Sequence, residues 1–74
     1  MTDLERVRDV KRRYNRELMR IPGVVGTGAG QDASGQPVIK VYVERDSPAL
    51  RRKIPDTVEG VSVRIVETGR FEAR

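Results

Sequence analysis

The chain has 74 residues, the size of one small domain, and at this length folding buries only about 60–65% of the surface that the unfolded chain exposes. It contains no cysteine and no histidine. Disulfides and thiolate metal sites are therefore excluded, and the commonest catalytic bases and nucleophiles are missing. The apolar runs are too short for a membrane span or the core of a signal peptide. We expect a cytoplasmic protein that is not an enzyme, needs no cofactor or metal, and does not bind membranes.

Residues 2–21 carry the pattern of an amphipathic helix. Thr2 and Glu5 form a capping box, in which each side chain can bind the backbone amide of the other residue. Pro22 ends the helix, because the residue before a proline is disfavoured in the α conformation. Apolar residues recur every three or four positions and define one helix face, which consists of Leu4, Val7, Val10, Tyr14, Leu18 and Ile21.

Residues 24–44 are predicted to form a β-hairpin. The first strand covers residues 24–31 and is weakened by its glycines, whereas residues 38–44 are rich in β-branched side chains. Asp32 and Gly35 mark the turn, since aspartate can accept hydrogen bonds from its own loop and glycine tolerates a positive φ. The side chains of the second strand that are expected to face inward are Ile39, Val41 and Val43.

A short helix and a third strand follow the hairpin. Ser47 is a favourable N-cap and Pro48 suits the first helical position, so residues 48–53 are predicted to be helical. Residues 61–67 alternate apolar and polar side chains, as a strand with one buried face does. Residues 68–74 are interpreted as a tail.

The order helix, strand, strand, short helix, strand predicts a single α+β domain over residues 1–74. Residues 45–60 are long enough for a crossover, so the third strand can lie parallel beside the second, or it can lie antiparallel beside the first. In both arrangements the main helix covers one face of a three-stranded sheet. We interpret this order as a truncated ferredoxin-like fold, a split βαβ unit that lacks its first strand.

Glycine occupies every second position of the first strand, at Gly26, Gly28 and Gly30. Together with Val24 these residues are expected to share one face, which would be almost without side chains. We favour the interpretation that the first helix packs closely over this face or that the strand bends there, and the alternative is that a ligand, a peptide or a second subunit approaches it. A dinucleotide-binding loop is excluded, because Gln31 stands where that motif needs glycine and a hairpin follows instead of a helix.

The net charge of +4 is concentrated in the first helix, since residues 1–20 hold seven Arg or Lys against four Asp or Glu. Such a helix face is usually solvated, and it also suits an acidic partner such as nucleic acid or an acidic protein. Aromatic side chains that could stack on bases are few, which makes nucleic acid the less favoured partner. Residues 51–53 add a second basic cluster, which the helix dipole alone can explain. The basic stripe of the first helix consists of Arg12, Arg13, Arg16 and Arg20.

Several segments resemble a small bacterial α+β module that occurs as short stand-alone proteins and next to trypsin-like peptidase domains. They are Ile-Pro-Gly-Val-Val-Gly-Thr-Gly-Ala-Gly at 21–30, Pro-Val-Ile-Lys-Val-Tyr-Val-Glu at 37–44, Ser-Pro at 47–48, Ile-Pro at 54–55, Glu-Gly-Val-Ser-Val-Arg at 59–64 and Thr-Gly-Arg-Phe at 68–71. The resemblance implies a peptidase partner and brings no catalytic residue to this chain. The Ile-Pro-Gly-Val corner also resembles ferredoxin-like metal-binding domains, but the cysteine motif of those domains is missing here.

The leading hypothesis is a non-enzymatic module that pairs with a protein partner or with itself as a homodimer. Its contact would be formed by Gly26, Gly28, Gly30 and the adjacent sheet edge. A second hypothesis is nucleic-acid binding by the arginines of the first helix. A third is a propeptide-like inhibitor or chaperone of a protease, whose tail offers Phe71 to the partner, although Phe71 could instead fold back onto the domain.

Overall fold

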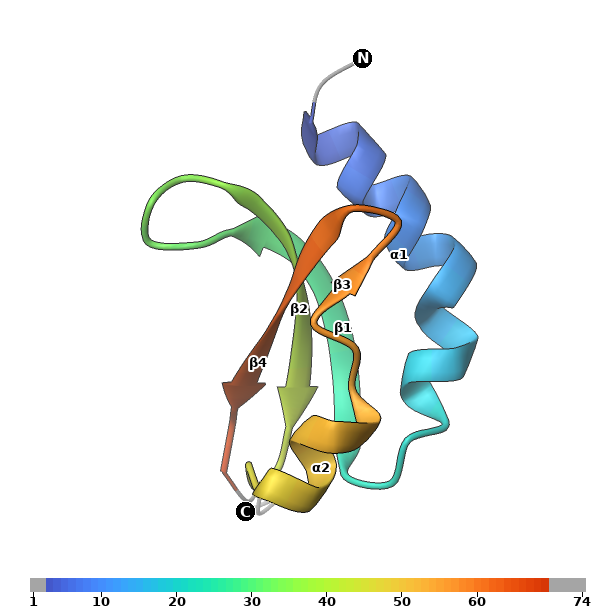
Figure 1. The fold of residues 1–74 in the computed structure, drawn as a ribbon, viewed down its shortest axis with the longest axis vertical. Coiled ribbons are helices and arrows are strands. Elements are labelled where there is room, and N and C mark those ends of the chain that lie inside the picture. The colour runs from blue at the N-terminus through green and yellow to red at the C-terminus, as the bar shows by residue number, and fades with distance from the viewer. Residues whose placement is uncertain (1–2, 70–74) are drawn as a thin grey trace, which may run out of the picture.

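The protein folds into a four-stranded mixed sheet covered by two helices, and a computed structural model describes residues 3–69 of the chain (Figure 1). The predicted α+β class is confirmed, as is the order of main helix, hairpin, short helix and strand. None of the helices in the described part combines the length and apolar character that crossing a bilayer requires. In chain order the elements are α1 (Asp3–Met19), β1 (Val24–Gln31), β2 (Pro37–Val43), α2 (Pro48–Lys53), β3 (Thr57–Val58) and β4 (Val61–Glu67).

The strands follow the order β1-β2-β4-β3 across the sheet. β1 and β2 form the predicted antiparallel hairpin, and β4 pairs with β2 in parallel, with Val41 opposite Ile65. Of the two arrangements left open for the strand at residues 61–67, the parallel one is therefore correct. The pairing continues beyond β4, where the Thr68 N–H donates to the Val43 carbonyl at 2.8 Å.

The prediction of only three strands is wrong, because Thr57 and Val58 form a fourth strand, β3, antiparallel to β4. Glu59 and Gly60 make the turn between them, with φ values of 49° and 80°. Two successive residues with positive φ give a turn whose twist matches that of a two-residue hairpin. A strand of two residues is too short to show periodicity, and glutamate is not a typical residue of such turns. The residue pattern therefore did not indicate this hairpin.

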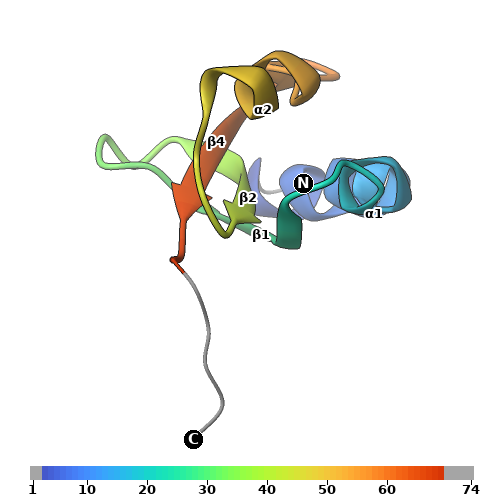
Figure 2. The ribbon, with the colours of Figure 1, turned by 90° about the horizontal axis from the view of Figure 1, so that it is seen from below.

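One apolar core lies between the helices and the inner face of the sheet. Ile39, Val41 and Val43 of β2 are fully buried in it, as predicted. Seen from below in Figure 2, both helices lie on the same side of the sheet, with α1 beside β1 at the edge. The opposite face of the sheet carries no helix within residues 3–69. The helices and β4 complete the core with Val7, Val10 and Leu18, with Leu50 and Ile54, and with Val61 and Val63.

A β-bulge near the start of β1 determines which way its side chains point. Val24 pairs with Val43, and Gly26 already pairs with Tyr42, so Val25 is an extra residue in the strand. Val24 is buried in the core, whereas Val25 is 48% exposed. The expectation that Val24 shares a face with the three glycines is therefore wrong, because the bulge shifts the alternation by one residue.

Two arginines of α1 hold the turn between β3 and β4. Arg13 donates from Nε to Oε2 of Glu59 at 3.1 Å and from Nη2 to Oε1 at 2.8 Å. Arg6 donates from Nη2 to the Glu59 carbonyl oxygen at 2.9 Å. The hydrogen bonds from Arg13 lower the pKa of Glu59, and the charge of Glu59 raises the pKa of the Tyr14 phenol. These contacts support a positive φ that residues other than glycine rarely adopt.

We expect Arg13→Ala to lower the urea midpoint of unfolding at neutral pH. Because the pKa of Glu59 is lowered in the folded protein, the pair stabilises the fold above the ordinary glutamate pKa of about 4.3 and loses this effect as the pH falls through the lower folded value. The difference between wild type and variant should therefore vanish in acid. Circular dichroism at several pH values measures it, with Arg16→Ala as a control of equal charge change. A difference that does not change with pH would contradict the assignment.

Candidate functional site

Gly26, Gly28 and Gly30 lie on the sheet face opposite to α1, so the favoured interpretation that the first helix covers them is wrong. The side chains next to these glycines come from β2. A Cβ atom on Gly28 would lie 3.2 Å from Cε2 of Tyr42, and a Cβ atom on Gly30 would lie 2.9 Å from Cε of Lys40. The glycines therefore make room for two cross-strand side chains of the same sheet.

Two glycine substitutions distinguish a glycine needed for its φ from one needed neither for its φ nor for space. Gly26 has no positive φ, and a Cβ there would meet Tyr42 at an ordinary 3.7 Å. Gly26→Ala should therefore raise stability by about 0.4–1 kcal/mol, because alanine restricts the unfolded chain. Gly23 has a φ of 99°, so Gly23→Ala should lower stability by about 1 kcal/mol or more. Thermal unfolding measures both, and effects of the same sign would contradict this account.

β1 forms one edge of the sheet, so one side of its backbone has no partner strand. The Asp32 N–H donates to the Gln36 carbonyl at 2.9 Å, so the next pair, Gln31 and Pro37, is a non-hydrogen-bonded pair of the ladder, and Pro37 has no N–H to donate. Because bonded and non-bonded pairs alternate, the N–H and C=O groups of Thr27, Ala29 and Gln31 point away from β2. They form an open row of donors and acceptors to which another strand can pair.

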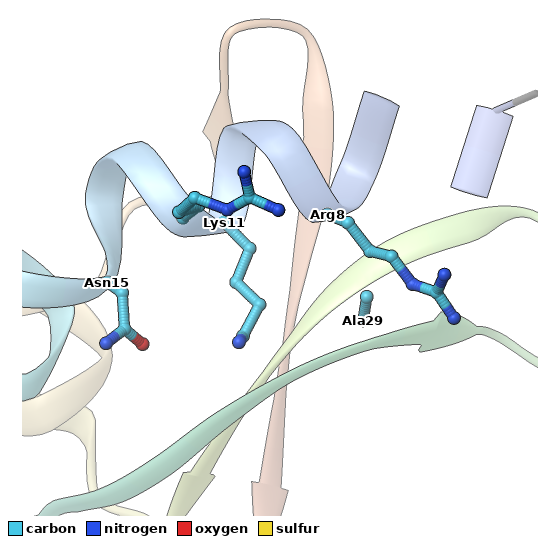
Figure 3. Close-up of a pocket in the computed structure, with 5 residues that line it drawn as sticks. Arg8, Lys11, Asn15 and Ala29 are labelled. Carbon is cyan, nitrogen blue, oxygen red and sulfur yellow. The ribbon is translucent and has the colours of Figure 1, made fainter. Parts of the chain in front are cut away.

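A groove of ≈ 420 Å³ lies between α1 and β1. Figure 3 shows Arg8, Lys11 and Asn15 extending from the helix toward β1, with Ala29 on the strand below them. The Thr27 hydroxyl donates to Oδ1 of Asn15 and so links the helix to the strand. The residues that line the groove are Arg8, Lys11, Arg12, Asn15 and Ala29.

The cations of this groove have no counter-ion among the residues that the structure describes. Within residues 3–69, the side chains of Arg8, Lys11 and Arg12 form no ion pair with an acidic residue. No acidic side chain lines the groove. Other arginines do have partners: Arg51 Nη2, for example, lies 2.6 Å from Oδ2 of Asp46. Like charges that lie close together on a helix repel each other, and an anion bound among them would offset this repulsion. The groove is therefore suited to an anionic ligand.

The arginine stripe predicted on the first helix is divided in the structure. Arg12 lines the groove, whereas Arg13 extends to the other flank of α1 and binds Glu59. Arg16 and Arg20 are exposed and do not line the groove. The structure therefore does not bring the four predicted arginines together into one site.

Sequence reasoning missed two of the three cations in the groove, Arg8 and Lys11. A signal for them is present in the spacing of residues 8, 11, 12 and 15, which places four polar side chains on one flank of the helix beside the apolar face. Counting charge along the helix hid this signal, because it grouped arginines that lie on different flanks. The second basic cluster, residues 51–53, contributes nothing to the groove.

The other predicted features give no further site. In the part of the chain that the structure describes, no group of three or more His, Cys, Asp or Glu side chains could hold a metal ion. Phe71 and the tail beyond Gly69 lie outside the described residues. Asp32 does bind its own turn, as predicted, accepting from the Ser34 and Gln36 amides at 3.0 Å each. Hydrogen bonds from Ser34, chiefly through its side chain, and from Gln36 lower the pKa of Asp32.

No protein-family model, curated protein or solved structure matches this chain. The resemblance to peptidase-associated modules therefore stays a prediction from the sequence. The groove beside the β1 edge is the candidate site because backbone groups and cations that have no partner within residues 3–69 lie together there.

Proposed function

We propose that this protein is a non-enzymatic interaction module that binds an extended, acidic segment of a protein partner as an added strand on β1. The observation that carries the proposal is the open backbone row of Thr27, Ala29 and Gln31 beside a groove whose three cations have no ion-pair partner in the described part of the chain. In strand addition, main-chain hydrogen bonds supply affinity and neighbouring side chains supply selectivity. Both elements of such a site are present at this edge.

A second copy of the chain suits this edge less well than an acidic partner. Residues 24–31 contain no acidic residue, so pairing of β1 with β1 would place no counter-charge next to Arg8, Lys11 and Arg12. A two-fold axis through such a continuous antiparallel sheet would also keep both α1 helices on the same face. Their like charges would repel each other across the new pair of strands. We therefore favour a hetero-partner over a homodimer.

Nucleic acid is the second candidate partner. It is favoured by the exposed Arg16 and Arg20, which extend the positive charge of α1 beyond the groove. A phosphate backbone would use these cations and would leave the backbone groups of the β1 edge unpaired. Its affinity would fall steeply with salt, in proportion to the number of phosphates contacted. A single-stranded oligonucleotide that binds without slowing hydrogen exchange at Ala29 would identify this mode.

The finer features inferred from the sequence belong to the same proposal. The lack of cysteine and histidine supports a binding role without catalysis and a location in the cytoplasm. The sequence resemblance supports a peptidase domain as one source of the acidic segment. The parallel β2-α2-β4 connection supports the interpretation of the fold as a ferredoxin-like unit that lacks its first strand.

Reversing the charge of the groove should weaken binding of an acidic strand-forming peptide such as Glu-Val-Glu-Val-Glu-Val-Glu. Arg8→Glu combined with Arg12→Glu removes two ion pairs and adds repulsion, so we expect the affinity to fall by about tenfold or more. Arg16→Glu combined with Arg20→Glu is the control, because it changes the net charge equally at two positions, one in α1 and one just after it, that lie outside the groove. Isothermal titration calorimetry measures both affinities. Equal losses of affinity in the two variants would mean that net charge alone, and not the groove, explains the effect.

Blocking the edge should abolish strand addition without changing the groove's charge. Ala29→Pro removes an N–H that points away from β2, so the β1–β2 ladder is retained while the edge loses a donor and gains a ring. We expect peptide binding to be lost and the far-UV circular dichroism to be unchanged. Ala33→Pro is the control, because Ala33 follows Asp32 in a turn where proline is favoured. Undiminished binding by a folded Ala29→Pro variant would contradict strand addition.

A further inference from the structure

We infer that the groove selects acidic side chains at alternate positions of the added strand, an acid-x-acid pattern. This inference rests on the proposed strand addition at β1 and specifies the partner's sequence class. Three features of the described residues carry it: the pleat of the sheet, the spacing of the cations on α1, and the small size of the β1 side chains beneath them.

The pleat decides which side chains of an added strand can reach the cations. A strand that pairs with β1 continues the sheet, so its side chains alternate between the α1 face and the opposite face. Ala29 and Thr27 mark the α1 face of β1, since Ala29 lines the groove and Thr27 bonds to Asn15. Only every second side chain of the partner would therefore lie next to Arg8 and Arg12.

The spacing of the cations matches this alternation. Arg8 and Arg12 are four residues apart on α1, a rise of about 6 Å along the helix. Two side chains on the same face of a strand are about 6.7 Å apart. The two arginines can therefore each meet one carboxylate of an acid-x-acid pair, and Lys11, which lines the same groove, adds a third positive charge near both.

The small side chains of β1 leave the room that this arrangement needs. Ala29 is the residue of β1 that lines the groove, and a larger side chain there would fill the space beneath the cations. On the opposite face, the glycines of β1 have beside them Lys40 and Tyr42 of β2. The positions of the partner between its acids would lie on that face, where Lys40 and not a row of cations flanks β1, so acids are not required at these positions.

A pair of peptides with equal composition tests the pattern. Glu-Val-Glu-Val-Glu-Val-Glu has its acids at alternate positions, and Glu-Glu-Val-Val-Glu-Glu-Val has no two acids at positions i and i+2. We expect the alternating peptide to bind about tenfold more tightly, because it alone places two carboxylates on the α1 face at the i, i+2 spacing that matches Arg8 and Arg12. In the Arg8→Glu, Arg12→Glu variant this preference should disappear, and in the Arg16→Glu, Arg20→Glu variant it should remain.

Hydrogen exchange separates failure of the pattern from failure of strand addition. The amides of Thr27, Ala29 and Gln31 point away from β2 and should exchange more slowly once a strand is added, whereas those of Gly28 and Gly30 face β2 and serve as internal references. Equal affinities for the two peptides, with slowed exchange in both complexes, would overturn the acid-x-acid pattern and leave strand addition standing. Binding with no slowing at these amides, or no binding at all, would overturn both.

Discussion

One extra residue in β1, Val25, determines how the sheet meets the helix. Side chains alternate along a strand, so a shift of one residue exchanges the two faces. Because of the bulge, Val24 joins the core while Thr27 and Ala29 face α1, and the glycines face the opposite side. Small side chains therefore lie beneath the polar flank of α1. Without the bulge, the helix would lie over bare glycines, and the groove would have neither Ala29 in its wall nor the link from Thr27 to Asn15.

The positive charges of α1 divide between two flanks with different roles. On one flank, Arg6 and Arg13 are used inside the molecule, where they hold the carbonyl and carboxylate of Glu59. On the other flank, Arg8 and Arg12 face the groove without a counter-ion within residues 3–69. Exposed ion pairs contribute little to stability one by one. The main effect of these arginines is on orientation. Arg6 and Arg13 hold the helix against the turn between β3 and β4, and Arg8 and Arg12 place positive charge beside an open strand edge.

Much of the fold could be predicted because its signals are periodic. The apolar face of α1, the buried residues of β2 and the N-cap of α2 at Ser47 each follow from local spacing, and Ser47 Oγ accepts from the Leu50 amide at 3.1 Å as expected. The bulge and β3 could not be predicted in this way. A bulge is a single extra residue, and the alternation that it breaks carried little signal because every second residue of this part of β1 is glycine. The turn that begins after β3 is held by residues of α1, which is distant in sequence.

The type of candidate site could be predicted from the sequence, but its position on the molecule could not. A basic first helix and an open sheet edge both follow from the sequence, but their meeting depends on which flank of α1 lies beside β1. That flank is set by the bulge and by the bonds from Arg6 and Arg13 to Glu59. Net charge along the helix therefore indicated Arg16 and Arg20, whereas the geometry selects Arg8 and Lys11.

The bonds between α1 and the β3–β4 turn also constrain the order in which the chain can become native. Arg13 and Glu59 are 46 residues apart, and β2, the central strand, receives its second neighbour only when β4 is made. During synthesis, α1 and the hairpin are made before α2, β3 and β4, whose apolar side chains complete the core. Pairing of such distant segments is slow because loop closure must come before the contacts that reward it. The bonds from α1 to Glu59 can thus form only after the turn between β3 and β4 has been made.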